Sequence, residues 1–257
     1  MTVRFHRYVA IGDSSTEGMI DPDGLGGFRG WANRLAEQIA ATQGALLYAN
    51  LGVRGRRTRQ IREEQLGPAL AMKPDLVTLF SGTNDVVRRH FDPVGVRHDL
   101  EAMQRTLVES GATVIGFTLP DLTPVMPLGR FIRHKVERLN DEIRAASAAS
   151  GAICVDMARH PVGSDPRLWN EDRLHANAVG HARIAAALAH GLGLPGSDAR
   201  WSEPLPPLPN ASLLDPIRAE LKWIGGHFAP WVWRHLMGRS SGDGRGPKRP
   251  ALTPMEG

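Results

Sequence analysis

Two short polar segments, far apart in the chain, together offer the parts of an activated nucleophile. One is Gly-Asp-Ser at 12–14, followed by a second serine, Ser15, and the other is Asp-x-x-His, in which Asp172 stands three residues before His175. A serine hydroxyl is a weak nucleophile at neutral pH, so it needs an adjacent base, and the base needs a third group to hold its tautomer. Ser14, His175 and Asp172 suit these three roles.

An acyl-transfer intermediate also needs hydrogen-bond donors directed at its oxyanion. The segments "NLGVRG" at 50–55 and "SGTNDV" at 81–86 supply candidates. We consider the backbone N–H groups of Ser14 and Gly52 and the side-chain amide of Asn84. Each has a simpler alternative: Ser14 can cap a helix, Gly52 can be a turn glycine, and Asn84 can bond its own loop backbone.

The elements between these segments predict a sheet that brings them together. Apolar runs typical of buried strands occur at 7–12, 45–52, 75–82, 112–120 and 152–157. The intervening stretches have helical spacing, and a final helix is predicted over 177–190. Alternation of strands and helices indicates parallel strands in a doubly wound α/β sheet. Because ligands bind at the carboxyl ends of such strands, we expect the polar segments to meet at one rim.

The segments "GDSSTEG", "NLGVRG", "GTND" and "DRLH", in this order across some 160 residues, resemble the conserved blocks of the GDSL, or SGNH, hydrolase family of esterases and lipases. The resemblance covers residues 5–192. It implies a flavodoxin-like three-layer α/β/α sandwich with a five-stranded parallel sheet in the order 2-1-3-4-5. It also implies Ser14 as the nucleophile, His175 as the base with Asp172, and Gly52 and Asn84 as oxyanion donors. Ser15 departs from the family pattern, which commonly has an apolar residue there, and so predicts a more polar pocket floor.

Composition excludes several other classes of protein. Of the net charge of +4, three positive charges belong to residues 200–257, so the body has no basic footprint and no nucleic-acid partner is predicted. No pair of His or Cys residues at ligand spacing is backed by a second pair, so we predict no metal. In "DGLGGFRGW", Arg29 stands where a dinucleotide fingerprint needs its third glycine, so no cofactor is predicted. The single cysteine, Cys154, and the absence of a recognisable signal peptide favour a cytoplasmic location.

The composition shifts near residue 195, which predicts a hydrolase domain over 1–195 and a C-terminal extension over 196–257. The extension holds 9 of the 19 prolines and 4 of the 6 tryptophans, with an amphipathic helix predicted around 214–224 and a flexible basic tail over the last twenty residues. We expect the extension to pack on the body and bury Trp201 and Trp223. The alternative is peripheral contact with an anionic membrane through the stretch from Trp231 to Arg239.

The sequence thus predicts a serine carboxyl-ester hydrolase that acts on a small-molecule ester through an acyl-enzyme. Cleavage of sugar O-acetyl groups, lysophospholipids or thioesters by the same residues stays open. A non-catalytic, flavodoxin-like binding module is the alternative outside the enzyme class.

Overall fold

A six-stranded sheet in the order β5-β4-β3-β1-β2-β6 forms the middle layer of the protein. The computed structural model describes residues 4–207 and 242–255. The strands are β1 (Arg7–Gly12), β2 (Leu46–Asn50), β3 (Leu76–Phe80), β4 (Thr113–Phe117), β5 (Ile153–Val155) and β6 (Arg249–Met255). The first five pair in parallel, and β6 runs antiparallel to β2.

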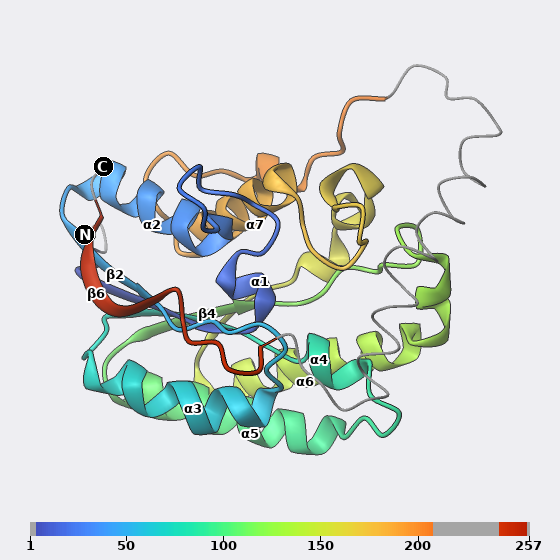
Figure 1. The fold of residues 1–257 in the computed structure, drawn as a ribbon, viewed down its shortest axis with the longest axis horizontal. Helices are drawn as coiled ribbons and strands as arrows, with labels where there is room; N and C mark the ends of the chain where they lie inside the picture. Colours follow the sequence, from blue (N-terminus) through green and yellow to red (C-terminus); the bar gives the residue numbers. More distant parts are fainter. Residues whose placement is uncertain (1–3, 208–241, 256–257) are drawn as a thin grey trace.

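Helices cover both faces of this sheet (Figure 1). α1 (Ser14–Glu17), α2 (Gly30–Gln43) and α7 (Ala178–Gly191) lie on one face, and α3 (Thr58–Ala71), α4 (Thr83–Val86), α5 (Pro93–Glu109) and α6 (Arg133–Ser150) lie on the other. Short 3-10 helices occur at η1 (Pro127–Phe131), η2 (Met157–Arg159), η3 (Pro161–Ser164), η4 (Pro166–Leu168) and η5 (Ala199–Ser202). The chain is therefore a three-layer α/β/α sandwich.

Burial of the strands and of one stripe on each helix explains these layers. Every residue of β3 is buried, as expected for a parallel strand covered on both faces. In α2, Trp31, Leu35 and Ile39 recur every four residues and are fully buried against the sheet. The predicted final helix forms as α7, where the Asn177 side chain accepts the N–H groups of Val179 and Gly180 and caps the first turn.

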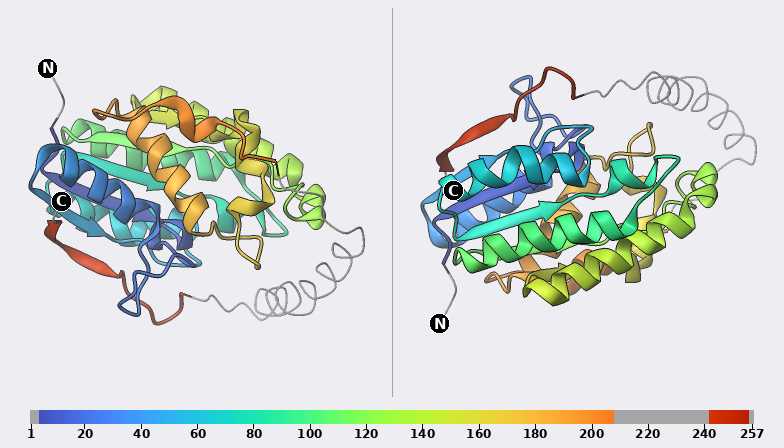
Figure 2. Two further views of the ribbon diagram at one scale, coloured as in Figure 1. Left: turned by 90° about the horizontal axis from the view of Figure 1, so that it is seen from above. Right: turned by 90° about the horizontal axis from the view of Figure 1, so that it is seen from below.

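The five parallel strands and their order confirm the predicted fold, but the sheet has a sixth strand. Part of the tail that the sequence predicts to be flexible forms β6 instead, along the outer edge of β2 (Figure 2). The Arg249 guanidinium lies 5.2 Å from the centre of the Tyr48 ring. Pro250 and Pro254 argue against a strand in the sequence, yet an edge strand tolerates proline because one side of its backbone is unpaired. The prediction of five strands was wrong for this reason.

The described part of the C-terminal extension packs on the body. Trp201 is only 8% exposed, as predicted. The predicted helix around 214–224, Trp223 and the stretch from Trp231 to Arg239 lie outside the described residues. Within the described ranges, no helix is long and apolar enough to cross a bilayer.

Candidate active site

Three loops at the carboxyl ends of the strands bring the predicted polar residues together. Ser14 begins α1 directly after β1, Asn84 lies in α4 after β3, and His175 precedes α7. The sharp turn from β1 into α1 depends on Gly12, which has φ +154° and whose added Cβ would lie 2.2 Å from Thr16 Oγ1 and 2.5 Å from the Phe80 carbonyl oxygen. Only glycine fits there, so the turn fixes Ser14 at the rim.

Ser14, His175 and Asp172 form one chain of hydrogen bonds. Ser14 Oγ lies 3.0 Å from His175 Nε2, and His175 Nδ1 lies 2.7 Å from Asp172 Oδ2. The other Asp172 oxygen accepts the backbone N–H groups of Leu174 and His175, each at 3.0 Å. With the Nδ1 proton directed to the carboxylate, Nε2 is left as the acceptor that faces the serine hydroxyl. This arrangement can remove a proton from Ser14.

Asp172 is held in its charged form. Burial alone would raise the pKa of its carboxyl group, but the hydrogen bond and charge of His175 and the two backbone N–H groups outweigh burial and lower the pKa. A charged Asp172 keeps the His175 ring in one tautomer and stabilises the imidazolium that forms when the ring takes a proton.

Asn84 lines the same pocket as Ser14 and His175. Its Nδ2 group donates to Asp13 Oδ2 at 3.2 Å and to the Arg56 carbonyl oxygen at 3.1 Å. The amide is therefore oriented toward the turn that carries Ser14. A substrate oxygen that binds this amide has to share or replace one of these two long hydrogen bonds.

Asp13 is a buried carboxyl group to which the sequence assigns no role. Its Oδ1 accepts the Ser15 N–H at 3.0 Å, so it caps the helix that begins at Ser14. Burial raises the pKa of Asp13 to about 6, against the opposing effects of the Ser15 N–H, the His175 charge and the Thr83 hydroxyl. In the sequence, only its position between Gly12 and Ser14 draws attention to Asp13. That position does not show whether the carboxyl group caps the helix or orients the Asn84 amide.

The structure does not support Gly52 as the oxyanion donor. Its N–H donates to the side chain of Asn50 at 3.0 Å, and an added Cβ would lie 2.8 Å from the Glu17 nitrogen, so Gly52 serves close packing. Gly55, in the same turn, lines the pocket and has φ +77°. The sequence predicts only a turn role for Gly55, because letters alone do not show which residues of the turn line the pocket.

Ser15 lies beside the nucleophile, as its position in the sequence requires. It lines the pocket, and its hydroxyl accepts the indole N–H of Trp31 at 3.1 Å. His181, also in the lining, joins α7 to α2 and to the segment after α1. Its Nδ1 accepts the Trp31 backbone N–H and its Nε2 donates to the Met19 carbonyl oxygen, both at 3.1 Å. Burial lowers the pKa of His181 to about 4, so the ring is neutral and structural at pH 7.

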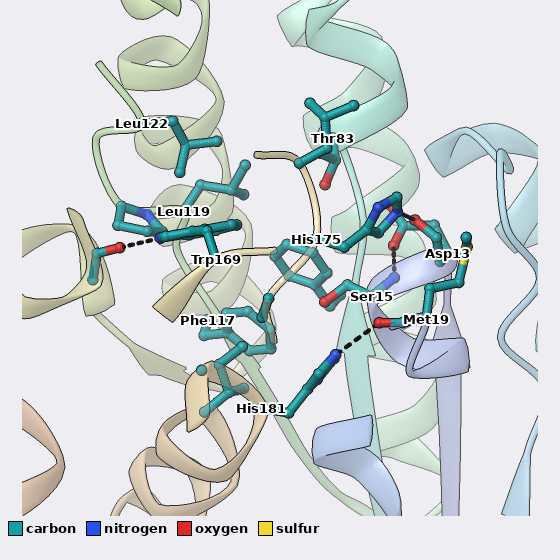
Figure 3. Close-up of a pocket in the computed structure, with 18 of the residues that line it drawn as sticks. Asp13, Ser15, Met19, Thr83, Phe117, Leu119, Leu122, Trp169, His175 and His181 are labelled. Carbon is teal, nitrogen blue, oxygen red and sulfur yellow. Dashed lines mark hydrogen bonds between the residues drawn. The ribbon is translucent and has the colours of Figure 1, made fainter. Parts of the chain in front are cut away.

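The pocket has two unlike sides (Figure 3). Asp13, Ser15 and His175 lie on one side, and Phe117, Leu119, Leu122 and Trp169 lie on the other. The cavity holds about 600 Å³, and further apolar lining comes from Phe80, Pro120, Met157, Val162, Leu168, Leu174, Ile184 and Trp201. Such a space accommodates a substrate well beyond the size of an acetyl group. Among the described residues, no group of three or more His, Cys, Asp and Glu side chains is arranged to hold a metal ion.

Several known proteins resemble this chain in sequence. The model of the GDSL-like lipase/acylhydrolase family matches residues 10–183. The chain is 28% identical over 194 residues to GDSL lipase Rv0518 of Mycobacterium tuberculosis. This alignment covers 72% of this chain and 81% of that protein. It is 26% identical over 209 residues to an acetylxylan esterase of Geobacillus stearothermophilus, which covers 71% of this chain and 92% of that protein.

Solved structures show the same fold. A catalytic mutant (S15A) of Axe2, an acetylxylan esterase from Geobacillus stearothermophilus, superposes with a TM-score of 0.64 at 17% identity, covering 78% of this chain and 100% of that chain. LAE5, an α/β hydrolase enzyme from the metagenome of Lake Arreo, gives a TM-score of 0.62 at 23% identity, covering 73% of this chain and 95% of that chain.

Proposed function

The chain belongs to the GDSL-like lipase/acylhydrolase family, and we propose that it is a serine carboxyl-ester hydrolase working through an acyl-enzyme. The observation that carries this proposal is the unbroken chain of hydrogen bonds from Ser14 Oγ through the His175 ring to Asp172. It joins a nucleophile, a base and an orienting carboxylate at the rim of a large pocket.

In the acylation step, Ser14 replaces the alcohol on the ester carbonyl carbon, and His175 carries the proton from the serine to the leaving alcohol. Ser14 Oγ gives its proton to His175 Nε2 as it bonds to the ester carbonyl carbon, and the carbonyl oxygen becomes an oxyanion. When this intermediate collapses, the bond to the alcohol breaks and the alcohol leaves with the proton from His175. Water then attacks the acyl-enzyme with His175 as its base, which releases the acid and restores the Ser14 hydroxyl.

Three donors surround the place of the oxyanion in this proposal. They are the N–H of Ser14, the N–H of Gly55 and the side-chain amide of Asn84. Ser14 stands in the first turn of α1, where backbone N–H groups have no partner within the helix. Gly55 replaces Gly52 because only Gly55 lines the pocket. Donors fixed before the reaction stabilise the developing charge without reorganising.

The test is to remove the nucleophile and locate the reactive hydroxyl. Ser14→Ala should lower turnover of a nitrophenyl ester by about 10⁶-fold, as in other serine triads. A fluorophosphonate should modify the wild-type protein at Ser14, as mapped by mass spectrometry. Ser15→Ala is the matched control, because it removes the neighbouring hydroxyl of the same pocket and should still give the adduct at Ser14. An adduct at another residue, or near-normal turnover in Ser14→Ala, would refute the mechanism.

A further inference from the structure

The pocket continues from His175 along the first turns of α7. Ala176, Gly180, His181 and Ile184 line it from the side of α7. Met157, Val162, Leu168 and Trp169 line it from the segment after β5. The added Cβ of Gly180 would lie 2.2 Å from the Leu168 carbonyl oxygen, so the two sides pack closely at that point. We call the part of the pocket between these two sides the channel, and Ser14 and His175 line the same pocket.

Trp201, in the segment that follows the family-matched region, also lines this pocket, and it contacts the later turns of α7 at Arg183 and His190. It lies in η5, 8% exposed, and its ring stands edge-on to His160 with the ring centres 4.6 Å apart. Its indole N–H donates to His190 Nδ1 at 3.2 Å, and its carbonyl oxygen accepts from Arg183 at 2.7 Å. The indole N–H and the carbonyl oxygen of Trp201 are thus bonded within the protein, and the ring is held in place.

Two further polar side chains of this part of the lining, those of Trp169 and Arg183, are engaged within the protein. The indole N–H of Trp169 donates to the Gly163 carbonyl oxygen at 2.9 Å. The Arg183 guanidinium donates to three backbone carbonyl groups, those of Arg200, Trp201 and Glu203. A sugar ring needs hydrogen-bond partners placed around it, whereas an alkyl chain needs none. The lining fits an alkyl chain.

The dimensions of α7 indicate how long this chain is. Ile184 lies six residues after Ala178, the first residue of α7, which corresponds to about 9 Å along the helix axis. A zig-zag of C–C bonds, each about 1.5 Å long, covers that distance in about seven carbons. The stretch of α7 that lines the pocket is therefore long enough for a chain of medium length.

On the basis of the proposed esterase function, we propose that the acyl half of the substrate is a straight chain of about six to ten carbons, by the same estimate. It lies along α7 with its methyl end against Trp201. Trp201 then sets the chain length, and the acyl group, not the alcohol, fills the apolar channel. Each methylene buried there should raise kcat/KM by about fourfold until the chain reaches Trp201.

The experiment compares straight-chain nitrophenyl esters from acetate to palmitate. In the wild-type protein kcat/KM should rise to a maximum near the octanoate and fall beyond it. Trp201→Ala should move the maximum to a chain at least two carbons longer, whereas Ile184→Phe, which fills the channel, should move it to a shorter one. Phe131→Ala is the control, because Phe131 is 63% exposed and lies outside the lining, so the profile should not change.

Other outcomes would overturn the inference about the acyl chain. An unchanged position of the maximum in both Trp201→Ala and Ile184→Phe would do so. A second series, acetates of increasingly large alcohols, tests whether the alcohol occupies the channel, and a stronger size dependence in that series would also overturn it. If circular dichroism shows that Trp201→Ala is unfolded, the chain-length profiles of Ile184→Phe and Trp201→Phe provide the test instead. Fluorophosphonate labelling of Ser14 in each variant separates a wrong chain length from a wrong esterase mechanism.

Discussion

The two sides of the pocket are held by different forces. On the nucleophile side, Glu17 of α1 and Arg54 of the turn before Gly55 form an ion pair, with side chains only 11% and 12% exposed. The Arg54 N–H also donates to Glu17 at 2.9 Å. On the opposite side, which we call the apolar wall (residues 157–169 and Trp201), the segments rest on apolar packing, on the partly exposed ion pair of Asp165 and Arg167, and on arginine donors to backbone carbonyl groups, such as Arg183.

The difference follows from what each side has to do. Catalytic donors and a nucleophile work only within narrow limits of distance and angle, and directional bonds between charged groups enforce such limits. An alkyl chain is recognised by the shape and apolarity of its surroundings, which close packing provides. In the proposed mechanism the polar side determines whether the reaction occurs, and the apolar wall determines which substrate reacts. Substitutions matched across the two sides test this division.

The largest effect on kcat is expected when one carboxyl group on each side of the pocket is replaced by an amide. Asp172→Asn should lower kcat on the order of 10⁴-fold, because an amide NH₂ directed at His175 Nδ1 favours the tautomer whose Nε2 cannot accept the Ser14 proton. Asp165→Asn is the control on the apolar wall, where Asp165 pairs with Arg167 and not with the histidine. It should change kcat less than about tenfold. Equal losses in the two variants would contradict the division between the sides.

The next effect concerns stability and the buried ion pair. Arg54→Met leaves the Glu17 carboxylate without its partner, so the free energy of unfolding should fall by about 3–5 kcal/mol. Turnover should also fall, by up to about 10²-fold, because the turn that carries Gly55 loses its attachment to α1. Urea unfolding and ester kinetics measure the two quantities.

The control for the ion pair is Arg59→Met, which breaks an exposed pair with Glu63 on α3. Its side chains are 79% and 58% exposed, so the loss of stability should stay within about 1 kcal/mol, with kcat unchanged. If Arg54→Met behaves like Arg59→Met, the buried pair does not position the nucleophile side.

The polar side was also the more predictable of the two from sequence. Ser14 and Asn84 each follow a strand within a few residues, and parallel strands must end at one rim, so topology alone brings them together. The sequence could not choose between Gly52 and Gly55, because both lie in one turn, and which of them lines the pocket depends on backbone angles that the letters do not specify. A local sequence pattern predicts the position of a loop better than it predicts the direction of the backbone N–H groups in that loop.

The apolar wall gave weaker signals. It consists of short 3-10 segments such as η3 and η4, which are too brief to show a hydrophobic period. The burial of Trp201 was predicted from its composition, but its place in the pocket depends on contacts with His160, His190 and Arg183. Such contacts, between residues well apart in the chain, follow from packing and not from pattern.

A pH effect of intermediate size should arise at His181. Its pKa is about 4 in the folded protein, chiefly because of burial, and 6.5 is its ordinary value. Between these values the unfolded chain binds a proton that the folded protein does not, so stability is lost as pH falls from 6.5 to 4. The loss should reach about 3 kcal/mol.

The comparison that isolates His181 is with His181→Gln, whose amide can accept from Trp31 and donate to Met19 without titrating. The stability of the wild-type protein relative to this variant should fall by about 3 kcal/mol over that range, as measured by urea unfolding at several pH values. Asp13, whose raised pKa of about 6 acts in the opposite direction, is present in both proteins and cancels. A constant difference across pH would show that the ring is not buried in its neutral form.

The smallest effect is expected where the apolar wall is attached through backbone groups. Arg183→Met removes the donors to the carbonyl groups of Trp201 and Glu203, each at 2.7 Å, and should cost about 1 kcal/mol of stability because these bonds are partly exposed. Since Trp201 then loses one of its anchors, the preferred acyl chain should lengthen in the same direction as in Trp201→Ala, but less. Fluorophosphonate labelling of Ser14 should still occur. Arg200→Met, in η5 beside Trp201 but with a side chain 77% exposed, should change neither quantity. A loss of labelling in Arg183→Met would mean that the two sides are coupled, and that the wall supports the chemistry as well as the choice of substrate.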